Sequence, residues 1–263
     1  MKYVLVLIFA LVGGFDMPSR CADLDELSRS IVFLKANSTN FATGFFLLTD
    51  KQHVFLATAE HVARALTTNS VVVIRGSDGN GFQIPMLTFM AGTNSYWRFH
   101  DTADLALLPI AWTADLEGEL ARAGQTVLAL PSKHLRGTES APSRAVTLTV
   151  LGFPLALGTE GKFSAISRET KPASGLLTVL RADTHKPAVF FITQDPSIGG
   201  FSGAPVFDTM LPTVSSGTLM LESGELQLVG IVHGTLSDNT GGKLGAITPA
   251  HELLTLLRSI SAP

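Results

Sequence analysis

The chain has 263 residues, of which 46% are hydrophobic and 16% are charged, and its formal net charge is −3. This apolar fraction is enough for a large core, and the length suits either one unit or two small domains. The charges form no long run of one sign, so neither nucleic acid nor an anionic membrane surface is an implied partner.

The first residues have the pattern of a secretory signal. Lys2 supplies one positive charge, an apolar segment follows, and Gly13 and Gly14 are small residues near a cleavage site. The apolar run is well short of the ~20 residues that a membrane span needs, which favours a signal peptide over an anchor. We assign residues 1–22 to a signal peptide and short leader. We therefore expect a secreted or periplasmic protein with no stable membrane anchor after signal cleavage.

Short strand candidates separated by turn signals dominate the rest of the chain and predict an all-β fold. After a short lead-in helix at 23–29, the first half is expected to contain strands at residues 31–34, 44–48, 54–58, 71–74, 82–90 and 104–110, with a short helix at 61–65. The second half is expected to contain strands at residues 145–152, 163–168, 176–180, 189–193, 226–233 and 244–248. Apolar positions at a helical spacing predict a terminal helix at 249–260.

The segment 113–125 differs from both halves because it is polar and partly helical in pattern. We interpret it as the connection between an N-terminal unit at 23–112 and a C-terminal unit at 126–263. Cys21 is the only cysteine, so no intramolecular disulfide can form and the fold must depend on core packing. The sequence gives no indication of an oligomeric state.

A serine lies among three glycines in the stretch Gly199–Phe207. Glycines allow unusual backbone angles and let amide groups face a bound atom, as a nucleophilic serine requires. The alternative is a glycine-rich turn ahead of a strand. Two other stretches favour the catalytic interpretation: an apolar run ends at His61, and Asp104 opens another apolar run. Asp101, three residues earlier, is the alternative to Asp104.

The order His61, Asp104, Ser202 is that of the chymotrypsin fold. The sequence resembles the trypsin-like serine proteases, and is most similar to bacterial exported members without disulfides, over roughly residues 28–260. Three motifs carry the resemblance: Thr58–His61 matches T-A-x-H, Asp104–Leu107 matches D-[IL]-A-L, and Gly200–Pro205 matches G-x-S-G-x-P.

This resemblance implies two packed six-stranded antiparallel β-barrels with a C-terminal helix, His61 and Asp104 in the first barrel, and Ser202 in the second. Ser202 would be the nucleophile, His61 the general base, and Asp104 the residue that orients the histidine. The backbone amides of Gly200 and Ser202 would form the oxyanion hole. No cofactor is implied, and no metal site either, because the His251-Glu252 pair lacks a second histidine four positions on.

The resemblance also points to substrate-binding residues. The strand at 230–234 is similar to the family's substrate-pairing strand, so His233, Gly234 and Thr235 would pair with the peptide backbone, although His233 could equally be an ordinary edge-strand residue. Trypsin-type members have an aspartate six positions before the serine, where this chain has Pro196 followed by Ser197. We therefore expect a small or apolar residue before the cleaved bond.

The resulting hypothesis is an exported serine endopeptidase that acts on a protein or peptide substrate through an acyl-enzyme. Two alternatives stay open at this stage: a non-catalytic relative that binds peptides in the same cleft, and an esterase that uses the same triad.

Overall fold

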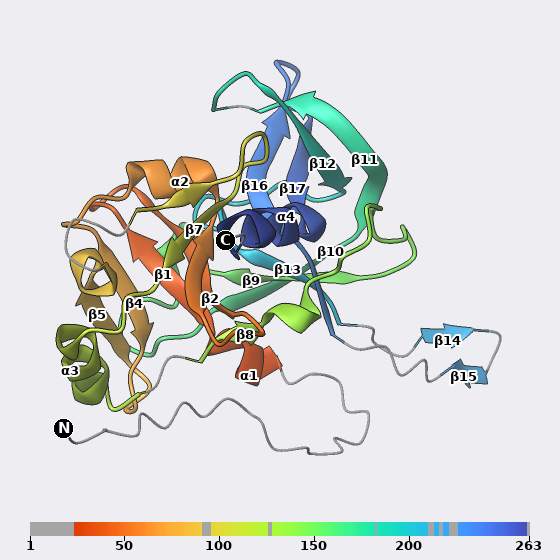
Figure 1. Cartoon of the computed structure of the whole chain (residues 1–263). Coiled ribbons are helices and arrows are strands. Elements are labelled where there is room, and N and C mark those ends of the chain that lie inside the picture. Colours follow the sequence, from red (N-terminus) through yellow and green to blue (C-terminus); the bar gives the residue numbers. More distant parts are fainter. Residues whose placement is uncertain are drawn as a thin grey trace.

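The computed structural model describes residues 24–90, 96–125, 128–181, 183–209, 213–215, 218–220 and 226–261. These residues form two large antiparallel sheets that lie side by side, one from each half of the chain (Figure 1). The expected signal peptide and leader at 1–22 lie outside the described residues.

The first sheet runs in the order β5-β4-β1-β2-β3-β7-β6, and β8 joins β2 in parallel. Its strands are β1 (Ile31–Lys35), β2 (Phe41–Leu48), β3 (Val54–Thr58), β4 (Val71–Arg75), β5 (Gly81–Pro85), β6 (Arg98–Phe99), β7 (Ala106–Pro109) and β8 (Leu130–Pro131).

The second sheet runs in the order β10-β9-β13-β16-β17-β12-β11. Its strands are β9 (Leu148–Gly152), β10 (Ile166–Thr170), β11 (Pro172–Leu180), β12 (Pro187–Thr193), β13 (Pro205–Asp208), β16 (Gln227–Ser237) and β17 (Lys243–Pro249). A separate ribbon of β14 (Thr213–Ser215) and β15 (Thr218–Met220) stands away from both sheets (Figure 1).

The described residues also form the α-helices α1 (Leu24–Ser28), α2 (Glu60–Ala65), α3 (Ala114–Ala123) and α4 (Ala250–Ser261). Helix α3 begins where the hydroxyl of Thr113 accepts a hydrogen bond from the amide of Leu116, and it ends at Gly124 in the left-handed conformation. Helix α4 is the expected terminal helix, and it packs on β16 and β17.

The all-β prediction with a C-terminal helix is confirmed. The sheets contain eight and seven strands where the family resemblance implied six each, and the two-residue strands β6 and β8 account for part of the excess. The predicted long strand at 82–90 was wrong. It stops at Pro85, and Met86–Phe89 form a 3-10 helix, because a proline without an amide proton cannot continue a strand ladder.

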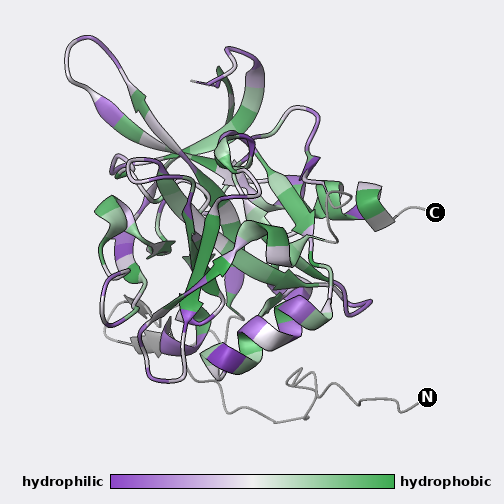
Figure 2. Ribbon diagram, turned by 90° about the vertical axis from the view of Figure 1, so that its left-hand side faces the viewer, coloured by the Kyte–Doolittle hydropathy of each residue, from purple (hydrophilic) through white to green (hydrophobic). Residues whose placement is uncertain are grey.

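The largest apolar cluster draws residues from both halves of the chain. The rings of Phe33 in β1 and Phe153 just after β9 meet edge to face at 5.7 Å, so side chains of the two halves pack directly. Figure 2 shows the same distribution, with hydrophobic residues along the interior strands and hydrophilic ones in the turns. Core packing thus joins the halves in a chain whose only cysteine has no partner.

Among the residues with described positions, no helix is both long and apolar enough to cross a bilayer.

Candidate active site

His61 and Asp104 form a two-point contact. Helix α2 starts directly after β3, so His61 lies in its first turn, and its backbone amide donates to Oδ1 of Asp104 at 3.0 Å. Its ring atom Nδ1 lies 2.7 Å from Oδ2 of the same carboxylate. Asp104 is fully buried, whereas Asp101, the alternative considered from the sequence, is exposed. The carboxylate next to His61 is therefore that of Asp104.

His233 adds a third side chain to this pair. It lies at an irregularity of β16, where the register with β17 shifts between Val232 and Gly234. A bulge redirects a side chain, and here Nδ1 of His233 lies 2.5 Å from Oδ2 of Asp104 while the ring packs on Phe190. His233 is therefore a buried partner of Asp104, a contact that the sequence did not suggest.

The charges in this cluster shift the pKa values of both members of the first pair. Burial alone would raise the pKa of the Asp104 carboxyl, but hydrogen bonds from His233 and His61 outweigh it and hold that pKa well below its usual range. Burial lowers the pKa of His61, yet the hydrogen bond and charge of Asp104 bring it above the ordinary value of 6.5. The pair is therefore a buried carboxylate beside an imidazole of raised basicity.

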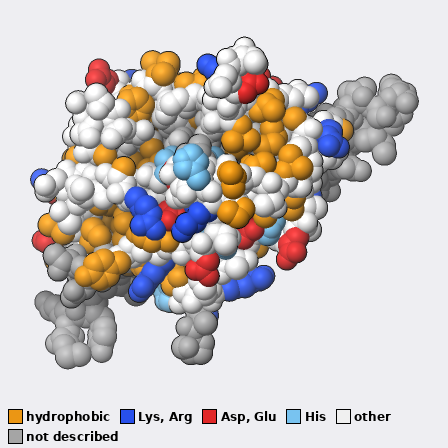
Figure 3. All heavy atoms as spheres, turned by 90° about the horizontal axis from the view of Figure 1, so that it is seen from above, with side chains coloured by type: hydrophobic (Ala, Val, Ile, Leu, Met, Phe, Trp, Pro, Cys, Tyr) orange, Lys and Arg blue, Asp and Glu red, His pale blue; other side chains and the backbone are white. Residues whose placement is uncertain are grey.

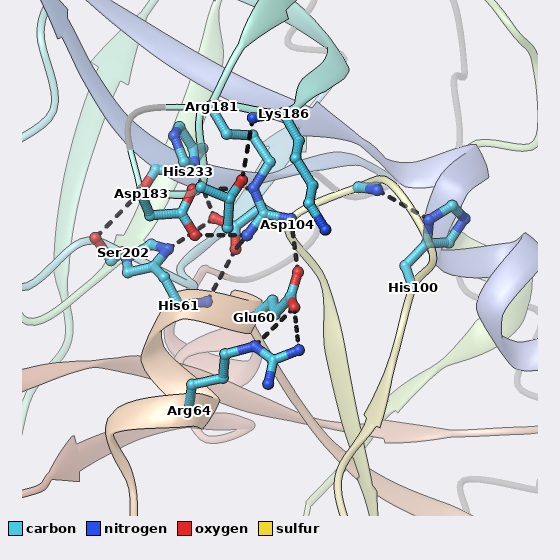
Figure 4. A network of polar contacts seen from close by, with 12 residues as sticks. Glu60, His61, Arg64, His100, Asp104, Arg181, Asp183, Lys186, Ser202 and His233 are labelled. Atoms are coloured by element: carbon cyan, nitrogen blue, oxygen red, sulfur yellow. Dashed lines mark hydrogen bonds and ion pairs between the residues drawn. The ribbon is translucent and has the colours of Figure 1, made fainter.

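Ser202 reaches this cluster from the second half of the chain. Its hydroxyl donates to the backbone carbonyl of His233 at 3.4 Å, and the rings of His233 and His61 are 5.6 Å apart. Figure 4 shows Ser202, His61, Asp104 and His233 gathered at one place between the two halves. The three residues expected to form a triad are thus brought together.

The glycines on either side of Ser202 have the backbone angles that the loop needs. Gly200 and Gly203 have φ values of +102° and +80°, a region that L-residues rarely adopt. The amides of Phe201 and Gly203 donate to backbone carbonyls, whereas within the described chain those of Gly200 and Ser202 donate to none. In the described part of the chain these two amides therefore have no backbone acceptor, as an oxyanion hole requires.

Thr43 in β2 links the first half of the chain to this loop. Its hydroxyl donates to the carbonyl of Gly200 at 2.7 Å and accepts from the amide of Phe153 at 3.0 Å, and its own amide donates to the carbonyl of Ser202 at 3.0 Å. The side chain is fully buried. Thr43 lies outside the three motifs, and the sequence carried no signal for it.

The residues expected to bind substrate lie beside the serine loop. Strand β16 pairs with β13 only as far as Ile231, so among the described strands the segment 233–237, with Gly234 and Thr235, neighbours β17 alone and its other edge is free. The hydroxyl of Thr235 donates to the carbonyl of Ser197 at 2.9 Å. Pro196 and Ser197 also line a cavity of about 20 Å³.

Viewed from above, the molecule exposes histidine at the centre of one face, with basic and acidic side chains directly beside it and hydrophobic side chains on both flanks (Figure 3). His61 belongs to the partly exposed residues, since 29% of its side chain is accessible. His61, Asp104 and His233 also lie close enough to be considered as metal ligands, but the atoms that would face an ion already hydrogen-bond to one another.

Arg181 is the second residue that the sequence analysis missed. Its guanidinium group, which comes from the end of β11, lies 3.0 Å from Oδ1 of Asp104 (Figure 4). No motif marks this position, and the contact joins residues 77 positions apart.

Two antiparallel sheets, a terminal helix and a His–Asp pair facing a serine loop from the other half define a chymotrypsin-like two-barrel fold. No protein-family model matches the chain, and no curated protein matches it either. Solved structures do match, and they are chymotrypsin-fold serine proteases at low sequence identity.

Rv3671c of M. tuberculosis, in an inactive mutant form, is similar with a TM-score of 0.51 and 19% identity, over 90% of this chain and 88% of that one. Deg5 gives a TM-score of 0.52 and 16% identity over 89% and 88%. Human heparin binding protein gives 0.51 and 14% over 93% and 96%. At these identities the comparisons establish the fold, so the expected resemblance is confirmed at that level.

Proposed function

We propose that the chain is an exported serine endopeptidase. The observation that carries the proposal is the His61–Asp104 contact of 2.7 Å beside a serine loop in which, within the described chain, the amides of Gly200 and Ser202 have no backbone acceptor and could receive an oxyanion. A buried carboxylate that accepts from Nδ1 leaves Nε2 of His61 as the basic atom.

The reaction would proceed in two steps, acylation of Ser202 and hydrolysis of the acyl-enzyme. Nε2 of His61 takes the hydroxyl proton of Ser202 while Oγ bonds to the substrate carbonyl carbon, and the new oxyanion is received by the amides of Gly200 and Ser202. The carbon–nitrogen bond then breaks, and the leaving amine takes the proton from His61. Water, activated by the same histidine, hydrolyses the acyl-enzyme and restores Ser202. The free edge at 233–237 would hold the peptide by adding it as a strand.

The class of substrate follows from the same site. The free strand edge suits an extended peptide better than a small ester, which favours a protease over an esterase. The segment 1–22 is the ground for export, because its composition is that of a secretory signal.

A non-catalytic peptide-binding protein is the second candidate. In its favour, the Ser202 hydroxyl donates to a backbone carbonyl, and we find no hydrogen bond between Ser202 and His61 in the described part of the chain. Hydrogen bonds of this kind are often poorly aligned before substrate binds, so the observation does not remove the catalytic candidate.

Labelling with a fluorophosphonate tests the proposal. We expect covalent labelling of the wild type, loss of labelling in Ser202→Ala and His61→Ala, and cleavage of a peptide library by the wild type. Labelling without any peptide cleavage would favour the esterase. Absence of labelling in a folded wild type, with retained peptide binding, would overturn the enzyme proposal and favour the second candidate.

A further inference from the structure

Arg181 brings a charge from the second half of the chain into the first. It directly follows β11, at the start of the turn that leads to β12, and its amide donates to the carbonyl of Lys186 at 2.9 Å. Its side chain is only 4% exposed and extends toward α2 and Asp104 (Figure 4). A long cationic side chain this deeply buried needs acidic partners.

Three carboxylates surround the guanidinium group. One terminal nitrogen lies 3.0 Å from Oδ1 of Asp104 and 2.6 Å from Oδ2 of Asp183, and the other lies 2.6 Å from Oε2 of Glu60. The Nε atom donates to Oδ1 of Asp183 at 2.9 Å. Arg181 thus uses both edges of its planar fork, a geometry that lysine cannot reproduce.

Two of these partners are linked to His61, one through the backbone and one through hydrogen bonds. Glu60 precedes His61 in the first turn of α2, and Asp104 hydrogen-bonds both the amide and the ring of His61. Arg181 therefore contacts both segments that determine where the imidazole lies. Asp183, on the hairpin, accepts from Nε and from the same terminal nitrogen that donates to Asp104.

We propose that Arg181 is a positioning residue that holds Asp104 against His61 and offsets the negative charge of the carboxylates around the imidazole. The proposal rests on the proposed protease function and deepens it. The β11–β12 hairpin would then contribute to the site, because Arg181 reaches Asp104 only when the hairpin is packed against the first half of the chain.

The charged and titratable groups that face this centre come from four elements. They are Glu60 on α2 with its second partner Arg64, Asp104 before β7, Asp183 on the hairpin, and His233 on β16. Burial lowers the pKa of His61, Asp104 and then Asp183 raise it, and Arg181 lowers it. With Arg181 removed, the carboxylates would act unopposed and the pKa of His61 would rise further.

The test compares three variants: Arg181→Met, Arg181→Lys and Asp183→Asn. The pKa of His61 is measured by NMR in a Ser202→Ala background, and the pH profile of kcat/KM is measured with Ser202 intact. Arg144→Met is the matched control, because Arg144 is exposed and its Nε donates to the carbonyl of Ala173.

We expect Arg181→Met to raise the pKa of His61 by roughly half to one unit, to move the acidic limb of kcat/KM upward by the same amount, and to lower kcat about tenfold. Arg181→Lys keeps the charge but loses the fork, so it should leave the pKa near the wild-type value while lowering kcat. Asp183→Asn removes a negative charge and should lower the pKa of His61. Arg144→Met should change neither quantity.

If Arg181 only anchors the hairpin, Arg181→Met should lower Tm and leave the pKa of His61 and the pH profile of kcat/KM unchanged. That result would overturn the proposal. If Arg181→Met does not fold, folded Arg181→Lys decides the question, because it keeps the charge and loses the fork: a wild-type kcat overturns the proposal, and a lowered kcat at an unchanged pKa of His61 supports it. If the wild type proves not to be an enzyme, the proposed function fails, but the NMR measurement still decides whether Arg181 controls His61.

Discussion

The hydroxyl of Thr43 donates a 2.7 Å hydrogen bond to the carbonyl of Gly200, a residue 157 positions further along the chain. This bond joins β2 of the first sheet to the loop that carries Ser202. Because the same hydroxyl accepts from Phe153, one side chain holds two segments of the second half in place. The peptide plane that follows Gly200 is therefore oriented from the opposite half of the molecule.

Thr43→Val should test that orientation. The substitution keeps the shape but leaves the carbonyl of Gly200 and the amide of Phe153 buried without partners, which costs about 1–3 kcal/mol of unfolding free energy. We expect slower fluorophosphonate labelling, measured as a second-order rate, along with a lower Tm. Thr43→Ser retains the hydroxyl and serves as the control. Wild-type labelling by the valine variant would show that the loop needs no such bond.

The site is expected to be active without defined N-terminal processing. In pancreatic-type relatives an aspartate before the nucleophile pairs with a new amino terminus, whereas this chain has Phe201 there, only 2% exposed and packed among apolar side chains of the second half. Chains expressed from residue 23 with one, two or five extra residues in front should be equally active, with mass spectrometry confirming that the additions remain. Activity from a single N-terminus only would contradict this expectation.

The pH dependence of kcat/KM should reflect the raised pKa of His61. Burial lowers that pKa, but Asp104 raises it above 6.5 overall, and only the neutral imidazole can accept the serine proton. Activity should therefore rise through a midpoint above pH 6.5. Stability should behave oppositely: the contribution of protonated His61 is fully present below the unfolded-state pKa and is lost as pH rises through the folded-state pKa. Comparing Tm against pH for wild type and His61→Gln measures this contribution, and a difference that grows with rising pH would contradict it.

Cleavage should follow small or apolar residues. Pro196 and Ser197 line a cavity of about 20 Å³, room for little more than a water molecule. Asp195 and Arg168 also line this cavity, and Asp195 accepts a hydrogen bond from Thr170 at 2.9 Å and lies 3.9 Å from Arg168. The positive charge of Arg168 therefore opposes the binding of a Lys or Arg side chain by Asp195. A peptide library analysed by mass spectrometry should show no preference for Lys or Arg, and an arginine-dominated profile would contradict the prediction.

Gly203→Ala should abolish labelling. A Cβ atom there would lie 2.1 Å from Oγ1 of Thr58 and 2.3 Å from the carbonyl of Thr43, and φ is +80°. Gly118 in α3 is the matched control, since a Cβ atom there meets nothing within 4 Å. Gly118→Ala should stabilise the helix by about 0.5–1 kcal/mol and leave labelling unchanged. A folded, fully reactive Gly203→Ala would show that the two halves can separate at this point.

Local patterns in the sequence were sufficient for much of the fold and for the main members of the site. Alternation and turn residues predicted most strands and the terminal helix, and short motifs pointed to His61, Asp104 and Ser202. The strand predicted at 82–90 failed because a 3-10 helix after Pro85 has no distinct apolar period. Thr43 and Arg181 could not be predicted, since their importance lies in contacts between segments 157 and 77 positions apart.

The close approach at Gly203 also has a consequence for the order of events during synthesis. Its neighbours Thr58 and Thr43 are made early, whereas the serine loop is made more than 140 residues later. Strand β16, where the carbonyl of Val232 accepts from the amide of Gly203, is made later still. Translation proceeds from the N-terminus at about 5–20 residues per second. A chain still on the ribosome therefore holds its base and carboxylate before any nucleophile exists. On the proposed function, such a chain is inert during synthesis until the residues after Ser202 have emerged, because the order of the three residues along the chain puts the nucleophile after the base and the carboxylate.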